Sequence, residues 1–141
     1  MKISFIYKRK TEPFQSDIKR IKKELKLLIN RTAAAEKTDI RSVNLIFCDD
    51  SFIADYNKEY LGHDYSTDII TFYDKDNGGI EGELLISADT VLDNSKRFRT
   101  DFDNELKRVV IHGILHLCGY DDRTTTQKAI IRKKENFYLK H

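Results

Sequence analysis

The spacing of apolar and polar residues predicts a chain that alternates between short strands and amphipathic helices. Branched and aromatic residues alternate with polar ones, or run together, over 3–7, 42–49, 66–74 and 80–87, which predicts four strands. Apolar residues recur at helical spacing at Ile18, Ile21, Leu25, Leu28 and Ile29, with Ser16 as the candidate cap of that helix. Further helices are predicted over 49–62, 88–99, 103–118 and 124–139, with Thr124 or Thr125 capping the last and a turn over 74–79.

This order of elements predicts an α/β (α+β) fold, in which a single layer of about four mixed strands packs with about five helices. The chain of 141 residues has no repeat or linker, so we expect one domain over 1–141. A composition of 40% hydrophobic and 34% charged residues with one proline is typical of a folded protein rather than a disordered one. The formal net charge of +2 permits a nucleic-acid partner without requiring it.

The sequence also predicts where the protein works. No stretch reaches the ~18 consecutive apolar residues that would cross a bilayer, and the first ten residues lack the features of a signal peptide. The two cysteines, Cys48 and Cys118, each lie in an apolar run, which is typical of reduced, buried thiols. We therefore expect a cytoplasmic protein with no membrane partner.

The stretch "VVIHGILHLCGYDD", over 109–122, carries the candidate chemistry. In a helix, His112 and His116 lie about 40° apart on one face and roughly 6 Å apart along the axis. Two imidazoles placed in this way can reach one metal ion at ~2.0–2.1 Å. The surrounding residues are apolar, so burying both imidazoles is costly unless each finds a partner. The alternative is a pair of core histidines that hydrogen-bond to the backbone.

The residues after the histidines offer a third ligand. Gly119 stands where a left-handed residue usually ends a helix, and a reversal there would bring the following residues back over the histidine face. Either Asp121 or Asp122 could then contribute a carboxylate, and Asp122 has the longer reach. Three protein ligands with one open position are typical of a catalytic zinc site.

The nearest general motif is the metzincin pattern H-E-x-x-H-x-x-G-x-x-H. His112, His116, Gly119 and Asp122 match its spacing, but Gly113 replaces the glutamate that serves as general base in a metalloprotease. The missing proton acceptor argues against peptide hydrolysis, and a small metallopeptidase stays only a distant alternative.

Three blocks of the sequence resemble the YbeY family of bacterial metal-dependent endoribonucleases that mature rRNA. "HGILHLCGYDD" is similar to the family signature H-G-x-L-H-L-x-G-Y-D-H, "NKEYLGHDYSTDIITF" to N-x-x-Y-R-G-x-D-x-x-T-[DN]-V-L-S-F, and "GELLIS" to G-D-[IL]-x-I-[SC]. The resemblance covers nearly the whole chain in order and spacing. It implies an α/β fold with a four-stranded sheet, a zinc ion at the end of a cleft, and action on ribosomal RNA.

Carried over position by position, the metal ligands implied by the resemblance are His112, His116 and Asp122. His112 and His116 would contribute to catalysis through the water that the metal activates. Aspartate replaces the third histidine of the family, which makes harder cations such as Mn²⁺ or Mg²⁺ more competitive with Zn²⁺. Leu61 stands where the family has an arginine, a natural phosphate clamp, so Lys58 and His63 are the candidate RNA-binding residues. For His63, an ordinary loop histidine is the commoner interpretation.

Other residues are candidates for contacts with RNA. Basic residues cluster over 19–26 and again at Lys128, Arg132, Lys133 and Lys134, although both stretches are also typical of a solvated helix face. The side chains of Tyr60, Tyr65 and Tyr73 could stack bases or simply pack at strand ends. Polar residues that match family positions near the cleft could also cap strand ends; these are Thr67, Asp68, Thr71 and Ser87.

The function predicted from these features is a single-strand-specific, metal-dependent endoribonuclease with one Zn²⁺ per chain. It would act in maturation of the 3′ end of small-subunit rRNA and in ribosome quality control. The alternative is a non-catalytic ribosome-assembly factor that binds rRNA, and possibly a small-subunit ribosomal protein, around a structural metal. The replacement at Leu61 favours the alternative, whereas the intact histidine pair and open ligand position favour the nuclease.

Overall fold

The computed structural model describes residues 1–8, 18–62 and 67–140 and confirms the predicted α/β fold. Within these ranges the elements follow in the order β1 (Lys2–Tyr7), α1 (Ile18–Ala35), β2 (Ile40–Cys48), α2 (Asp50–Leu61), β3 (Ile69–Asp76), β4 (Gly79–Ser87), α3 (Ala88–Arg97), α4 (Phe102–Leu117) and α5 (Thr125–Lys140). The strands form one sheet in the order β1-β2-β4-β3. The β1–β2 and β2–β4 pairs are parallel, and β3 runs antiparallel to β4, which places β3 at an edge.

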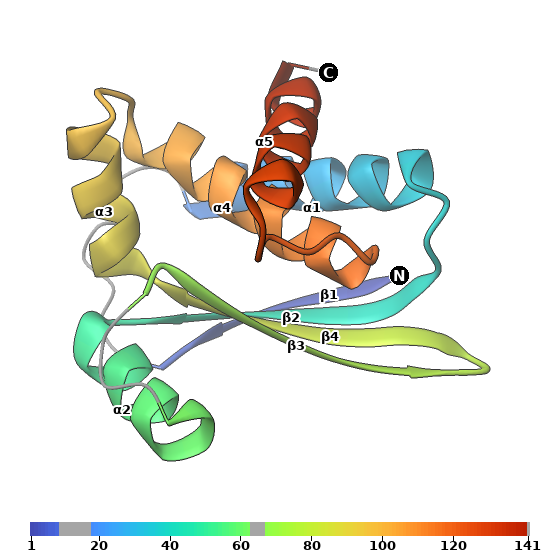
Figure 1. The fold of residues 1–141 in the computed structure, drawn as a ribbon, viewed down its shortest axis with the longest axis horizontal. Coiled ribbons are helices and arrows are strands. Elements are labelled where there is room, and N and C mark those ends of the chain that lie inside the picture. The colour runs from blue at the N-terminus through green and yellow to red at the C-terminus, as the bar shows by residue number, and fades with distance from the viewer. Residues whose placement is uncertain (9–17, 63–66, 141) are drawn as a thin grey trace.

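The helices divide between the two faces of the sheet. Figure 1 shows α1, α4 and α5 over one face and α2 beneath the other. Alternation along β3 follows this division, since Ile69 packs toward the α1–α4 side while Ile70 and Phe72 join the cluster around Ile53 of α2. Residues of β3 that share the face of Ile69 therefore look toward α4.

Helix α4 packs against the sheet at two glycines, where no side chain separates the two elements. A Cβ at Gly113 would lie 2.8 Å from the Cδ1 of Ile69 and 2.8 Å from the Cδ2 of Leu84. A Cβ at Gly82 of β4 would lie 2.6 Å from the Cδ1 of Leu117. Gly113 is thus a packing residue on the sheet-facing side of α4, and the glutamate of metalloproteases has no room at this position.

Several boundaries differ from the predictions. The turn predicted over 74–79 is much shorter, because the β3–β4 ladder continues to the pair Asp76 and Gly79. The Asp76 carboxylate accepts a hydrogen bond from the Gly78 amide at 2.7 Å, and Gly79 takes a φ of 106°, which only glycine adopts easily. The helix predicted over 88–99 ends at Arg97, and Arg99 follows with a φ of 55°.

Two other predictions have mixed outcomes. Thr124 caps α5, since its hydroxyl accepts a hydrogen bond from the Gln127 amide at 3.1 Å, whereas Ser16 lies outside the described residues. Cys48 is buried as predicted, but Cys118 is only half-buried, so the prediction of two buried thiols was wrong for that residue. Among the described helices, none combines the length and the apolar character needed to cross a membrane.

Candidate metal centre

The last turns of α4 present both predicted histidines to one point in space. The Nε2 atoms of His112 and His116 lie 3.1 Å apart. The Oδ2 of Asp122 lies 3.2 Å from the Nε2 of His112 and 3.7 Å from that of His116. Ligand atoms ~2.0–2.1 Å from a tetrahedral ion are about 3.3 Å from one another, so the three donor atoms fit one metal ion.

The chain reversal after α4 brings Asp122 to the histidines. Gly119 has a φ of 102°, and its amide donates to the His116 carbonyl at 3.0 Å. The Tyr120 amide donates to the Leu115 carbonyl at 3.0 Å, which completes a Schellman motif. The Asp121 carboxylate pairs instead with the Nε of Arg123 at 3.2 Å. Asp122 is therefore the aspartate that joins the histidines, the option that its longer reach favours.

A buried carboxylate from α5 orients one of the imidazoles. The Oε2 of Glu135 lies 2.7 Å from the Nδ1 of His112, and its Oε1 lies 3.2 Å from the Nη1 of Arg108. With the proton on Nδ1, the Nε2 of His112 keeps its lone pair for a metal ion, an arrangement common around histidine ligands. Burial opposes protonation of His112, but the hydrogen bond and charge of Glu135, with the charges of Asp122 and Asp68, outweigh burial and raise the pKa of the imidazole.

Sequence reasoning missed Glu135, although the pattern of α5 contains a signal. The buried residues of this helix are Ile131, Glu135 and Tyr138, so a glutamate occupies the apolar stripe at helical spacing. A carboxylate at such a position needs a cation or a donor. That requirement indicates a partner in the core but does not identify it as His112.

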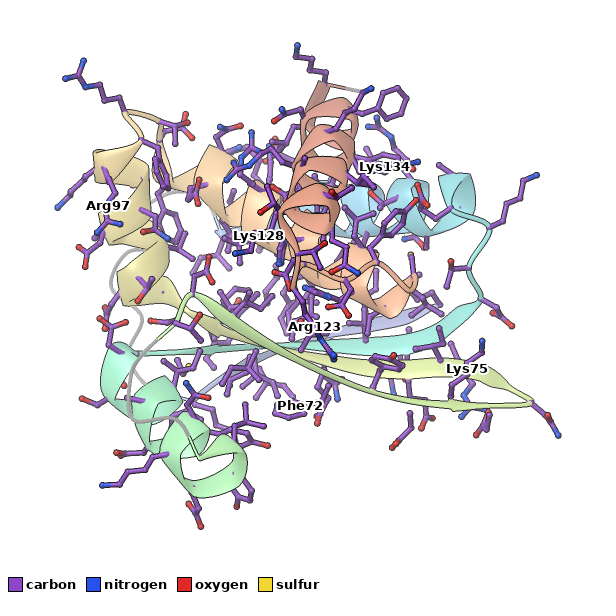
Figure 2. All side chains as sticks on the ribbon, in the orientation of Figure 1. Phe72, Lys75, Arg97, Arg123, Lys128 and Lys134 are labelled. Atoms are coloured by element: carbon purple, nitrogen blue, oxygen red, sulfur yellow. The ribbon has the colours of Figure 1, made fainter. Side chains whose placement is uncertain are left out.

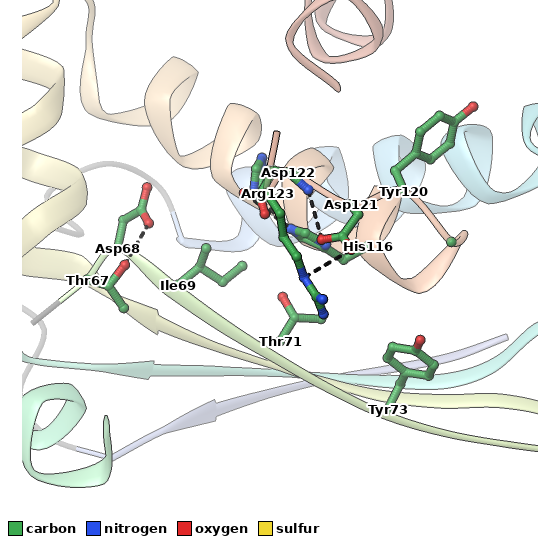
Figure 3. A pocket seen from close by; sticks show the side chains of 12 residues that line it. Thr67, Asp68, Ile69, Thr71, Tyr73, His116, Tyr120, Asp121, Asp122 and Arg123 are labelled. Carbon is green, nitrogen blue, oxygen red and sulfur yellow. Dashed lines mark hydrogen bonds and ion pairs between the residues drawn. The ribbon is translucent and has the colours of Figure 1, made fainter. Parts of the chain in front are cut away.

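The donor triangle opens into a pocket of about 450 Å³ between the α4–α5 connection and β3. Figure 3 shows Thr67, Asp68, Ile69, Thr71 and Tyr73 along one side, and the loop that carries Asp121, Asp122 and Arg123 along the other. Three of the polar residues that matched family positions, Thr67, Asp68 and Thr71, therefore line the pocket. Burial raises the pKa of the Asp68 carboxyl, although the charge of His112 opposes the rise.

Ser87 does not belong to this pocket, and the prediction that placed it near the cleft was wrong. Its side chain is fully buried, accepts a hydrogen bond from the Thr90 amide at the start of α3, and donates to the Asp50 carboxylate at 2.6 Å. Ser87 thus caps helix α3. This role resembles the alternative interpretation, in which these polar residues cap the ends of strands.

Comparison with known proteins identifies the family. The family model described as endoribonuclease YbeY matches residues 6–141. The chain belongs to the YbeY family. An endoribonuclease YbeY of Phocaeicola vulgatus is 45% identical over 120 residues, which cover 85% of this chain and 86% of the relative. One of Cytophaga hutchinsonii is 44% identical over 117 residues, with 82% of each chain covered.

A solved structure agrees with this assignment. The solution structure of a Thermotoga maritima protein superposes with a TM-score of 0.66 at 28% identity and covers 98% of this chain and 87% of its own. The fold derived above is thus shared with an experimentally determined protein of low sequence identity.

The two predicted RNA-binding residues are not brought to the donor triangle. Lys58 lies on α2, which Figure 1 places under the opposite face of the sheet, and it does not line the pocket. His63 lies outside the described residues. Leu61, at the position of the arginine in the YbeY signature, is 43% exposed at the end of α2. Lys58 and His63 remain predictions as RNA contacts.

One cation that sequence reasoning did not single out does line the pocket. Arg123 carries the only guanidinium or ammonium group among the described residues of the pocket wall. Its side chain is 84% exposed, and its Nε is held by Asp121. Figure 2 places Arg123 on the helix side of the sheet, opposite Phe72.

The two predicted basic stretches have partly structural roles. The Nζ of Lys22 lies 5.5 Å from the ring centroids of Phe5 and Tyr7, and Arg20 pairs with Asp103 at 2.8 Å. On α5, Lys134 pairs with Glu36 at 3.1 Å. These contacts make a structural role a sufficient explanation for Arg20 and Lys22 in the first stretch and for Lys134 in the second.

Proposed function

We propose that this chain is a single-strand-specific, metal-dependent endoribonuclease whose single domain acts in the cytoplasm. Its substrate would be ribosomal RNA, in maturation of the 3′ end of the small-subunit rRNA and in ribosome quality control, with a small-subunit ribosomal protein as a further partner. The observation that carries the proposal is the triangle of His112, His116 and Asp122 at the floor of an open pocket. Membership of the YbeY family supports RNA as the substrate.

The donor set suits one divalent ion per chain. Two imidazoles and a carboxylate are typical ligands of Zn²⁺, and the carboxylate also suits harder cations such as Mn²⁺. Once bound, such an ion would supply a hydroxide-like nucleophile at neutral pH and neutralise charge on the phosphate under attack. We propose Zn²⁺ as the resident ion, held by His112, His116 and Asp122.

The surrounding side chains have separate tasks in this proposal. Glu135 holds the proton of His112 on Nδ1 and so fixes the orientation of the ring. The guanidinium of Arg123 binds a phosphate oxygen at the mouth of the pocket, where its planar fork suits an anion. The hydroxyls of Thr67 and Thr71 lie on the facing wall and can donate to the sugar–phosphate backbone.

A cleavage assay with matched variants tests the proposal. Bound metal is quantified in the purified protein, and cleavage of a small-subunit rRNA fragment is compared for wild type, His116→Ala and Asp121→Ala, with and without added Zn²⁺ or Mn²⁺. We expect metal-dependent cleavage by wild type and Asp121→Ala and none by His116→Ala. Cleavage that persists unchanged in His116→Ala would contradict the site, because the activity would then not depend on the metal ligands.

The same assay also tests the alternative function. RNA binding without cleavage under any divalent metal would support a non-catalytic assembly factor that holds a structural ion. Loss of the folded state on metal removal, followed by circular dichroism, would support the same conclusion, because a structural site contributes directly to folding.

A further inference from the structure

The edge strand β3 carries a row of side chains that leads away from the donor triangle. Residues two apart on a strand share a face. The face of β3 toward α4 therefore carries Ile69, Thr71, Tyr73 and Lys75. Successive members of this row lie about 7 Å apart. That spacing is comparable with the distance between neighbouring phosphates in an extended single strand of RNA.

Two hollows meet along this row. The pocket at the donor triangle is lined by Thr71, Tyr73 and Gly119, among others. A second hollow of about 440 Å³ is lined by Tyr73, Gly119, Lys37 and Lys75. Because both hollows share Tyr73 and Gly119, they form one groove that runs from the histidines toward the hairpin end of β3, where Figure 2 places Lys75.

Tyr73 stands where the two hollows join, and its ring is available for a ligand. The residue is 53% exposed, and Figure 3 shows its side chain rising from β3 on the side of the loop at Tyr120. Among the described residues it has no ring contact and no side-chain hydrogen bond. Tyr60 differs, because its ring packs 4.4 Å from that of Tyr56 on the opposite side of the sheet.

The far end of the groove is lined by two lysines and two aspartates. Lys37, just after α1, and Lys75 are both exposed, and neither ammonium group pairs with a carboxylate in the described part of the chain. The acidic residues of the second hollow are Asp39 and Asp76, and the Asp76 carboxylate lies 3.3 Å from the Nη2 of Arg41. The two lysines are therefore placed to bind an anion from either wall.

We propose that this groove is a nucleotide subsite next to the candidate metal centre. The ring of Tyr73 stacks one unpaired base of an RNA strand, and Lys37 and Lys75 bind the phosphate that follows it. This inference rests on the proposed function, because that function is the reason to expect RNA as the ligand. A base that stacks on a side chain must leave the stack of a duplex, so the subsite selects single-stranded RNA.

A fluorescent reporter tests the stacking directly. The chain contains no tryptophan, so Tyr73→Trp introduces a unique indole into the groove. With chelator present to prevent cleavage, addition of a short single-stranded RNA should quench this fluorescence, because a stacked base quenches indole emission. Tyr60→Trp, on the opposite side of the sheet, is the matched control and should respond only weakly. Equal responses from both variants, or none from Tyr73→Trp, overturn the proposal.

Binding measurements separate the contributions of ring and lysines. By fluorescence anisotropy, Tyr73→Ala should weaken binding of single-stranded RNA about 5- to 150-fold, the range measured for single stacked bases, and Tyr73→Phe should bind as wild type. Lys37→Ala combined with Lys75→Ala should reduce the slope of log K against log salt by about 0.7, the value for the one phosphate that both lysines bind. The control Lys96→Ala, at an exposed position of α3 that lines neither hollow, should leave affinity within about twofold of wild type.

The outcomes distinguish failure of the proposed subsite from failure of the proposed nuclease function. Normal binding by Tyr73→Ala, or no binding of single-stranded RNA by wild type, overturns the subsite whatever the cleavage assay gives. Binding that depends on Tyr73 in a protein without metal-dependent cleavage supports the subsite and contradicts the nuclease. Duplex RNA of the same sequence should bind more weakly and lose little with Tyr73→Ala, and an equal loss for both forms also overturns the proposal.

Discussion

Glu135 lies 2.7 Å from the Nδ1 of His112 although the two residues are 23 positions apart on different helices. Its other carboxylate oxygen contacts Arg108, and its side chain is only 5% exposed. A buried carboxylate held from both sides has little freedom to move. The orientation of the His112 imidazole is therefore built into the packing of α5 against α4 and does not depend on a ligand.

Removal of the Glu135 carboxylate should weaken metal binding while the fold remains. We expect Glu135→Ala to reduce Zn²⁺ affinity about 10- to 100-fold, the usual effect of losing the partner of a histidine ligand. Glu135→Gln should cost less, because its amide oxygen can still accept from Nδ1. Competition with a chromophoric chelator measures the affinity. Glu59→Gln on α2 is the control, and a Zn²⁺ affinity unchanged in Glu135→Ala would contradict the role of Glu135.

Neighbouring aspartates should differ sharply in their effect on metal content. Asp122→Ala removes one donor of the triangle and should leave the purified protein with little bound metal, whereas Asp121→Ala removes no donor and loses only the contacts to Arg123 and to the Asp122 amide. Asp122→His should preserve binding and shift preference toward Zn²⁺ over Mn²⁺, since imidazole is the softer ligand. Elemental analysis after dialysis measures the metal content. Similar metal loss in both alanine variants would contradict the assignment of Asp122.

The parts of the site that the sequence predicted depend on short-range geometry. One helical turn fixes the relation of His112 to His116, and a left-handed glycine fixes the reversal that returns Asp122. The contacts that escaped prediction depend on how distant elements pack. Glu135 reaches His112 only because α5 lies against α4, and no local pattern encodes that pairing.

Proximity in sequence did not identify the residues that line the pocket, for a related reason. Lys58 lies only a few residues from the segment that enters β3, but α2 lies under the face of the sheet opposite α4. Arg123 and Tyr73 reach the pocket from the loop after α4 and from the edge strand. The strands themselves were predictable because alternation encodes them, whereas the side on which each connecting helix packs was not.

A glutamate after the first histidine should not convert this protein into a protease. A side chain at position 113 points at Ile69 and Leu84, so Gly113→Glu would bury a carboxylate in the contact between α4 and the sheet. We expect a loss of about 3 kcal/mol or more in the free energy of unfolding, measured by urea denaturation, and no cleavage of casein. Asn104→Glu, at an exposed position near the start of α4, is the control and should change stability by less than about 1 kcal/mol. Wild-type stability in Gly113→Glu would show that α4 can move away from the sheet.

Glu36 should make the stability of the fold depend on pH in the acid range. Its carboxylate accepts hydrogen bonds from the hydroxyls of Tyr120 and Tyr138 and from the ammonium group of Lys134. Burial alone would raise the pKa of this carboxyl, but the three donors outweigh burial and the pKa is lowered. A lowered pKa contributes stability that is present above the unfolded value of about 4.3 and is lost as pH falls through the folded value.

Glu36→Gln should therefore be less stable than wild type by about 1–3 kcal/mol at neutral pH, since hydrogen bonds to a charged group are the strong ones. The difference should shrink as pH falls from the unfolded value of about 4.3 through the lowered pKa of Glu36, because the wild-type carboxylate then becomes protonated and neutral. Urea unfolding followed by circular dichroism across this pH range measures the difference. Glu24→Gln, which removes an exposed ion pair with Arg20, is the control and should cost less than about 1 kcal/mol. A Glu36→Gln deficit that stays constant with pH would mean that shape rather than charge makes Glu36 important.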